Sequence, residues 1–275
     1  MRVGHTSIEG VCAVLLQEAG CGDAPDEVVR AGRRGVTANI GISTVWKDKN
    51  IYDEAAAGYD MLIRRFVPCY DAMQGRVVDT VAELCGTSSS LKLVELGVGT
   101  GALAYRVLSD LPVGHYCGYE MSPSLASLAR ARLSLFGADA IVEEADFREA
   151  AWPTDVSAIV STLTFHYLAN SEKAQVFRKC FHSLGSRGVL VVGDRVISRN
   201  ARCGAVYHSR MTRFWDQATV HWTEQLRLAH KTQDDPKEEP WYLEDQLDLL
   251  KTVGFAEVEC IWKDFNYCVF CGIRD

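Results

Sequence analysis

Short apolar runs alternate with segments of helical periodicity between residues 90 and 194, and this alternation leaves the chain few folds to adopt. Strands are expected at residues 91–96, 115–120, 140–144, 158–163 and 189–193, with helices at 102–110, 123–135 and 172–184. Such regular alternation predicts a doubly wound α/β fold, in which helices cover both faces of a mainly parallel sheet. The continuous apolar run at 188–192 suits a central strand that is buried on both sides.

The segments around this alternation extend the fold. Residues 50–85 have a helical periodicity that Pro68 interrupts, so we expect helices before the first strand. A further helix is expected at 243–251. Three residues separate the last two expected strands, at 258–263 and 267–273, and this spacing predicts an antiparallel hairpin at the end of the sheet.

Composition limits the class of protein. The formal net charge of −7 disfavours a nucleic-acid backbone as the main partner. The apolar run at 11–16 is too short for a secretory signal or a membrane span. The 10 cysteines are scattered, and many lie in apolar runs, which is typical of reduced, buried thiols. We therefore expect a cytoplasmic protein with no membrane segment.

Only Cys268 and Cys271 have a spacing like that of metal ligands. Both fall in the last expected strand. An offset of three residues in a strand directs two side chains to opposite faces of the sheet. No metal site is therefore expected at this pair.

The first strand-to-helix turn holds the chemistry. It carries Gly97, Gly99 and Gly101, which let the backbone turn sharply and approach a ligand. The following helix offers free amide donors at its N-terminus. Glu95 precedes the first glycine, and Glu120 closes the next strand, where ribose hydroxyls need an acceptor. In open parallel sheets, ligands bind at the edge formed by the carboxyl ends of the strands, where this turn lies.

The glycine spacing separates two classes of ligand. Nicotinamide dinucleotides use Gly-x-Gly-x-x-Gly, whereas the turn here is Gly-x-Gly-x-Gly. Glu95 also stands where it can meet an amino group. An adenosine ligand with an amino-acid tail therefore fits better than a ligand with a pyrophosphate.

These motifs resemble a known family. Residues 91–194 are similar to the core of class I S-adenosylmethionine (SAM) dependent methyltransferases, on the motifs at 94–101, 118–123, 144–147 and 162–168. Outside the core, the segments at 67–70, 254–255 and 262–267 are similar to the carboxy-SAM synthase branch and to uncharacterised bacterial-type relatives. The resemblance implies SAM as cofactor.

The resemblance also implies a set of cofactor-binding residues, most of them at strand ends. They are Tyr70, Glu95, Gly97, Gly99, Gly101, Glu120, Met121, Asp146, Phe147 and Thr162. The glycines are expected to cradle the methionine part, with Glu95 near its ammonium and Tyr70 at the same end. Tyr70 is alternatively a core aromatic side chain.

The same resemblance assigns the adenosine part. Glu120 is expected to bind the ribose hydroxyls, and Met121 to lie on the adenine or simply to pack. Asp146 is expected to accept from the adenine amino group, while Phe147 supplies a backbone amide or packing. Thr162 occupies a position near the cofactor where the synthase branch has an asparagine.

The catalytic side is less defined. His166 follows the fourth expected strand and is either a general base or a packed histidine bonded to the backbone. Asp194 ends the fifth strand at the same edge, or caps a helix. The aromatic residues Phe214, Trp215 and Trp222 either line an acceptor pocket or belong to the core.

One departure from the synthase branch concerns the extra carboxylate of carboxy-SAM. That branch holds it with an arginine, and the matching position here is about Leu249. Asp245 and Asp248 lie nearby and would repel a carboxylate. Ordinary methyl transfer to a small-molecule acceptor, through an oxygen, nitrogen or carbon nucleophile, is therefore the favoured function.

Two other classes remain open. A basic face built from Arg64, Arg65, Arg202, Arg210 and Arg213 would favour an RNA-modifying methyltransferase. A filled acceptor cavity would favour a SAM-binding protein without catalysis.

The domain organisation follows from these motifs. Residues 46–275 are expected to form the methyltransferase domain, with 201–240 as a helical insertion over the acceptor site. Residues 1–45 differ in pattern and form a small helical appendage or lid, or a partly ordered tail.

Overall fold

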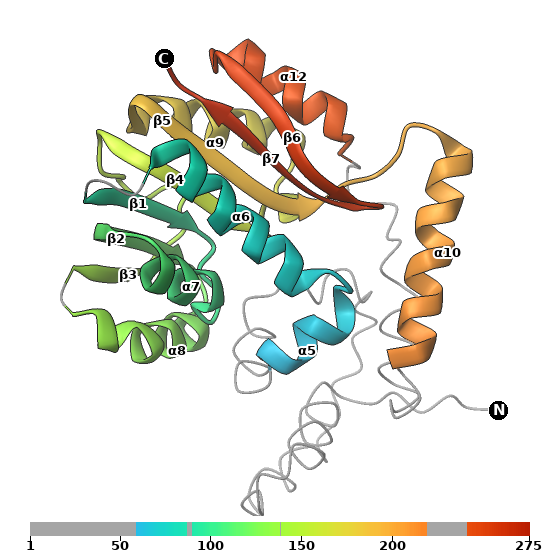
Figure 1. The fold of residues 1–275 in the computed structure, drawn as a ribbon, viewed down its shortest axis with the longest axis horizontal. Helices are drawn as coiled ribbons and strands as arrows, with labels where there is room; N and C mark the ends of the chain where they lie inside the picture. Colours follow the sequence, from blue (N-terminus) through green and yellow to red (C-terminus); the bar gives the residue numbers. More distant parts are fainter. Residues whose placement is uncertain (1–58, 87–89, 138, 219–240) are drawn as a thin grey trace, which may run out of the picture.

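The computed structural model describes residues 59–86, 90–137, 139–218 and 241–275. Within these ranges seven strands form one sheet in the order β3-β2-β1-β4-β5-β7-β6 (Figure 1). The strands are β1 (Leu91–Leu96), β2 (Val113–Glu120), β3 (Ala140–Glu144), β4 (Val156–Thr162), β5 (Leu184–Arg195), β6 (Glu257–Asp264) and β7 (Tyr267–Ile273). β1 to β5 pair in parallel, while β7 runs antiparallel to both β5 and β6. The expected doubly wound sheet with a terminal hairpin is confirmed.

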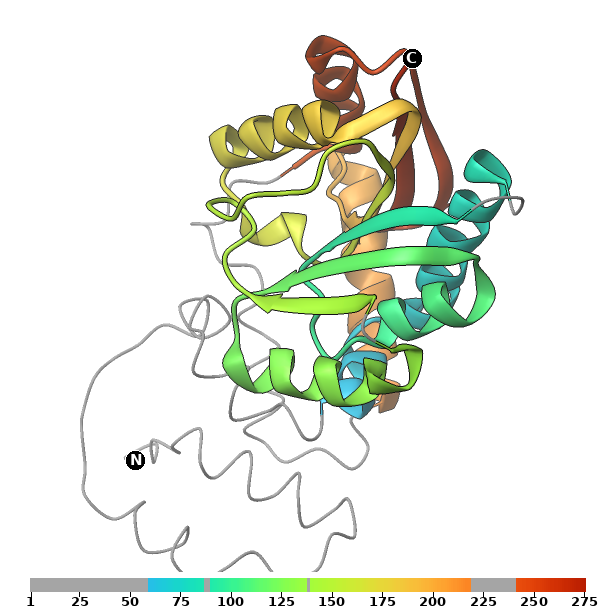
Figure 2. The same ribbon diagram turned by 90° about the vertical axis from the view of Figure 1, so that its left-hand side faces the viewer.

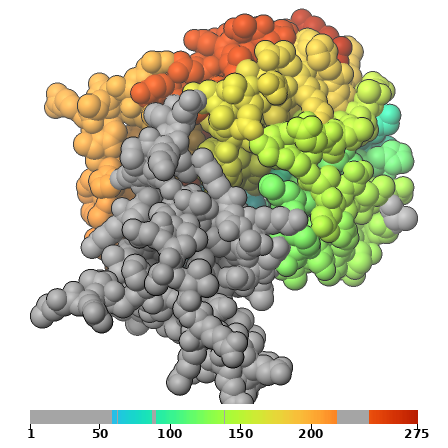
Figure 3. All heavy atoms as spheres, turned by 180° about the vertical axis from the view of Figure 1, so that it is seen from behind, coloured from blue at the N-terminus to red at the C-terminus, as the bar shows by residue number. Residues whose placement is uncertain are grey.

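Helices cover both faces of the sheet. They are α5 (Tyr59–Phe66), α6 (Tyr70–Cys85), α7 (Ala102–Asp110), α8 (Pro123–Leu133), α9 (Asn170–Ser183), α10 (Ala201–Ala218) and α12 (Leu243–Val253), with short 3₁₀ turns η2 (Ser134–Phe136) and η3 (Phe165–Tyr167). α6, α7 and α8 pack on one face and α9 and α12 on the other (Figures 1 and 2). The space-filling view shows α9 and α12 side by side, with α10 at one margin (Figure 3).

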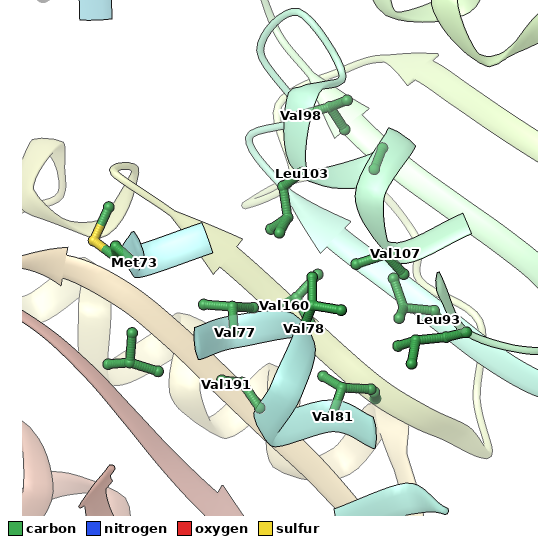
Figure 4. Packing of buried hydrophobic residues seen from close by; sticks show 14 of the residues in the cluster. Met73, Val77, Val78, Val81, Leu93, Val98, Leu103, Val107, Val160 and Val191 are labelled. Carbon is green, nitrogen blue, oxygen red and sulfur yellow. The ribbon is translucent and has the colours of Figure 1, made fainter. Parts of the chain in front are cut away.

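Two apolar clusters fix these layers. On one face, apolar side chains of α6 and α7 interlock with those of the strands (Figure 4). The helices contribute Met73, Val77, Val81, Leu103 and Val107, and the strands contribute Leu93, Val160 and Val191. The opposite cluster joins β1, β4 and β5 to α9 and α12. The run Val189 to Val192 is fully buried, as expected for a central strand. Burying each such side chain contributes about 1.5–3 kcal/mol.

Several boundaries differ from expectation by a few residues. β5 begins at Leu184 rather than at residue 189, because Leu184 directly follows α9 and already pairs with Val156 of β4; the pairing is irregular over residues 185–188 and continues at Val189 with Ala158. Cys268 and Cys271 enter opposite apolar clusters, as the strand spacing predicts. No helix in the described ranges is long and apolar enough to span a membrane. The expectations for residues 1–45 and 219–240 lie outside the described residues.

Candidate active site

A cavity of about 540 Å³ opens where β1, β2, β3 and β4 end. The strand order places β2 and β3 on one side of β1 and β4 on the other, so the chain changes direction at this point. Ligands of open α/β sheets bind at such a switch point. The wall comes from the segments after each strand, namely 97–100, 120–122, 146–148 and 162–169, together with residues of α5 and α6.

The glycine turn has the backbone that its sequence requires. Gly97, Gly99 and Gly101 have φ values of 74°, 59° and 80°, a region that side chains with a Cβ rarely adopt. A Cβ on Gly97 would meet the side chain of Thr164 at 2.3 Å, whereas nothing lies within 4 Å of a Cβ on Gly99. A Cβ on Gly101 would lie 3.2 Å from the Cα of Ala129 in α8. Gly97 and Gly99 line the cavity, and Gly101 instead packs the turn onto α8.

Glu120 ties the turn to the next strand. Its Oε2 accepts from the amide of Gly99 and its Oε1 from the amide of Ser122, both at 2.8 Å. These two hydrogen bonds hold the Glu120 carboxylate in the cavity wall, at the end of β2. Met121 follows it, half-exposed on the rim of the cavity.

Asp146 lies in the cavity wall but already has a partner. Arg148 donates to its carboxylate from both the backbone amide (2.9 Å) and the guanidinium (Nη2, 2.5 Å). This contact lowers the pKa of Asp146. Arg148 also reaches Glu172 at 2.5 Å. Phe147 lines the cavity beside them, and its carbonyl accepts from Trp152.

Glu95 is buried beneath the turn rather than in the cavity wall. Its Oε2 accepts from the hydroxyl of Tyr116 at 2.7 Å, while its Oε1 finds no hydrogen-bond partner among the described residues. Burial raises the pKa of Glu95 to about 8. An isolated carboxyl in such a place favours a cationic ligand, which would stabilise its charged form.

The first two turns of α6 supply two polar side chains to the cavity, Tyr70 and Gln74. Gln74 Nε2 donates to the Tyr70 oxygen at 2.7 Å. Burial and the nearby carboxylates of Asp60 and Glu95 raise the pKa of Tyr70 to about 12, so its hydroxyl stays protonated. Tyr70 is thus both a packed aromatic side chain and a wall residue.

His166 enters the cavity wall from η3, and its partner is Asp194 of β5. The imidazole Nδ1 lies 2.6 Å from Oδ1 of Asp194. The carboxylate of Asp194 also accepts from the backbone amides of His166, which lies in η3, and of Arg195. The loop that positions His166 is unusual, because Leu163 has a φ of 52°, a conformation that is rare and strained for a residue with a Cβ. Thr162 precedes it and lines the cavity.

α5 closes one side of the cavity with Tyr59. Asp60 anchors this helix, since it accepts from the hydroxyl of Thr100 in the glycine turn and from the guanidinium of Arg132 in α8. Arg132 also donates to Thr100 at 3.2 Å. The anchor therefore couples α5 to the turn that would hold a ligand.

Four of these residues were not among the candidates from the sequence: Gln74, Tyr59, Asp60 and Arg148. Gln74 lies one helical turn after Tyr70, and this offset was available as a signal. Asp60 is far from the glycine turn in sequence, so nothing in the sequence pointed to its contact.

Comparisons with known proteins agree with this geometry. Residues 93–188 match the methyltransferase domain family. An uncharacterized methyltransferase of Geobacillus kaustophilus is 30% identical over 169 residues, which cover 61% of this chain and 73% of that protein. A carboxy-S-adenosyl-L-methionine synthase of Nautilia profundicola is 20% identical over 226 residues, covering 81% of this chain and 93% of that protein. The human N-acetylserotonin methyltransferase structure with SAM has a TM-score of 0.54 at 15% identity, covering 97% of this chain and 66% of that one.

The chain belongs to the SAM-dependent methyltransferases. Its cofactor is therefore SAM, and the cavity residues fit this ligand. Its positive sulfonium and ammonium suit a cavity that has the carboxylate of Glu120 in its wall and the carboxyl of Glu95 buried beneath the glycine turn. The free space next to Gly99 leaves room for a ligand to approach the backbone. The individual contacts of the methyltransferase with SAM remain predictions.

Two of the aromatic residues predicted to line an acceptor pocket, Phe214 and Trp215, lie on α10 of the methyltransferase. Trp215 of α10 packs against the core and donates to the carbonyl of Phe66 at 3.1 Å. Neither Phe214 nor Trp215 lines the cavity, and Trp222 lies outside the described residues. Leu249 packs into the cluster on the opposite face of the sheet.

Proposed function

We propose that this methyltransferase transfers the methyl group of SAM to an oxygen or nitrogen atom of a small-molecule acceptor, and that His166 removes the acceptor's proton. The supporting observation is the contact between His166 and Asp194 at the cavity wall. With a proton on Nδ1 donated to Asp194, the neutral ring keeps a lone pair on Nε2. Such a ring is a competent general base.

The remaining residues would align the reactants. SAM, when bound, supplies an electrophilic methyl group on its sulfonium. Glu120 would hold the ribose, and the turn at Gly97 to Gly99 would hold the methionine part. Alignment of this kind is the main contribution to a displacement reaction. Apolar wall residues, including Leu103 and Leu125, would exclude water.

Ordinary methyl transfer is favoured over the use of carboxy-SAM. An additional carboxylate would need a cation in the cavity wall. Among the described residues of the cavity wall, the guanidinium that could meet this carboxylate belongs to Arg148. Asp146 and Glu172 already neutralise its charge. Leu249 offers no charge and lies across the sheet.

A small molecule is favoured over RNA as acceptor. Two of the arginines in the possible basic face are ion-paired, Arg64 with Asp71 and Arg210 with Asp264. Their charge is therefore largely cancelled. The overall charge of −7 points in the same direction.

The test is a transfer assay with methyl-labelled SAM and a panel of phenols, amines and carboxylic acids. We expect label transfer to at least one class, and a loss of about 10²- to 10⁴-fold in turnover for His166→Gln. His182 is an exposed histidine on α9, so His182→Gln is the matched control and should have the turnover of the native protein. Native turnover in His166→Gln would remove the proposed base, and label on transfer RNA with none on small molecules would favour the RNA alternative.

A further inference from the structure

Gln74 is a buried polar residue in the cavity wall that the proposed reaction does not use. Its side chain is 1% exposed, and it lies on α6 one turn after Tyr70. Its Nε2 donates to the Tyr70 oxygen. Its Oε1 has no hydrogen-bond partner among the described residues. A buried amide oxygen left in this state costs free energy unless a ligand supplies the donor.

The position of Gln74 limits what that donor can be. The neighbouring α6 residues Met73 and Val77 lie over Gly193 of β5, beside Thr162 at the end of β4. The ribose candidate Glu120 instead ends β2, and the adenine candidate Asp146 follows β3. Because the sheet order is β3-β2-β1-β4, a cofactor with its adenosine at β2 and β3 extends its amino-acid end toward β4 and α6.

The groups around Gln74 suit an α-amino acid. The protonated hydroxyl of Tyr70 is a donor, and the oxygen of Gln74 is an acceptor. Glu95 lies close enough to Tyr70 to affect its ionisation and has an unpartnered Oε1 of its own. An ammonium carries three protons and needs several acceptors, while the adjacent carboxylate needs donors.

We propose that Gln74 is a cofactor-binding residue: its Oε1 accepts a hydrogen bond from the ammonium of the methionine moiety of SAM, next to the hydroxyl of Tyr70. The inference rests on SAM as the cofactor but not on His166 or on the acceptor. If the amide of Gln74 were rotated by 180°, its Nε2 would face the ligand and would donate to the carboxylate of the methionine moiety instead. Ligands that lack either the amino group or the carboxylate distinguish these two arrangements.

The experiment is calorimetric titration of the full chain with S-adenosylhomocysteine, its desamino analogue, its decarboxylated analogue and 5′-methylthioadenosine. Gln74→Met keeps the length of the side chain and removes the amide. We expect this substitution to weaken the binding of S-adenosylhomocysteine about 10- to 100-fold, the usual effect of losing a hydrogen bond to a charged group. Binding of the desamino analogue and of 5′-methylthioadenosine should be unchanged, and the latter also shows that the variant is folded.

Gln246→Met is the matched control, because Gln246 is 2% exposed on α12, across the sheet from the cavity. It should bind all four ligands like the native protein. The inference is overturned if Gln74→Met binds S-adenosylhomocysteine normally, or if its defect disappears with the decarboxylated analogue instead of the desamino one. If the native protein itself binds none of the four ligands, the placement of the cofactor in this cavity is overturned as well. A failure of the cofactor site is thereby distinguished from a failure of the role of Gln74 alone.

Discussion

Both oxygens of the Asp194 carboxylate contact the same residue, His166. Oδ1 lies 2.6 Å from the imidazole Nδ1, and Oδ2 accepts from the backbone amide at 3.0 Å. Asp194 is 1% exposed, so water does not compete for these contacts. The end of β5 thereby fixes both the backbone and the ring of a residue that follows β4.

This double contact makes the tautomer of His166 testable. In Asp194→Asn the amide can still accept from the backbone of His166, but its NH₂ group then faces Nδ1. The ring would carry its proton on Nε2 and could not act as a base there. We expect turnover to fall about 10²- to 10⁴-fold while the affinity for S-adenosylhomocysteine is unchanged. A transfer assay and a titration measure the two quantities, and a variant with native turnover would contradict the role of the pair.

Glu95 predicts proton release on cofactor binding. With a pKa of about 8, this carboxyl is protonated in the free protein at neutral pH. A bound ammonium favours the charged form, so binding below pH 8 expels a proton. The affinity for S-adenosylhomocysteine should therefore rise with pH between about 5.5 and 7, by up to tenfold per unit, before the ligand's own amino group titrates.

Calorimetric titration in buffers of different ionisation enthalpy measures the number of protons released when S-adenosylhomocysteine binds. Glu95→Gln should bind more weakly and show little pH dependence in the same range. 5′-Methylthioadenosine lacks the ammonium and should bind the native protein with no proton release. Equal heats of S-adenosylhomocysteine binding in all buffers would contradict a neutral Glu95.

Gly99 predicts a variant that folds but does not bind. Gly99→Leu fills open space in the cavity, at a strain of about 1 kcal/mol for the positive φ. Gly137→Leu is its control, because Gly137 also has a positive φ (83°) and nothing within 4 Å, yet is exposed after η2 and away from the cavity wall. Its ψ of −165° lies in a region essentially confined to glycine, so thermal unfolding should show at least as large a loss of stability for Gly137→Leu as for Gly99→Leu. Only Gly99→Leu should lose binding of S-adenosylhomocysteine; intact binding would remove the turn from the cofactor site.

The fold was accessible from sequence because its signals are local. β1, α7, β3 and β7 occur at the expected residues, since each is a run of one periodicity bounded by glycine, proline or charge. The glycine turn likewise carries its signal within a few residues. Boundaries such as the start of β5 depend on pairing with β4, which periodicity does not record.

Only those parts of the candidate site that lie in sequence motifs could be predicted from the sequence. Gly101 matches the motif yet faces Ala129 of α8, a contact between segments far apart in sequence. Asp146 fits the adenine position, but its ion pair with Arg148 requires side-chain geometry. The orphaned oxygen of Gln74 is a property of packing, so no pattern of residue types could reveal it.

The anchor of α5 predicts an effect on ligand release. Asp60 accepts from Thr100 and Arg132, so Asp60→Ala frees the helix that places Tyr59 in the cavity wall. The ion pair is about one-third exposed, and solvent screening reduces its contribution. We expect the dissociation rate of S-adenosylhomocysteine to rise about 3- to 10-fold, with a smaller change in the association rate. Asp79→Ala removes an exposed ion pair with Arg76 on α6 and should leave both rates unchanged. Stopped-flow displacement measures these rates, and equal dissociation from native protein and Asp60→Ala would show that α5 does not retain the cofactor.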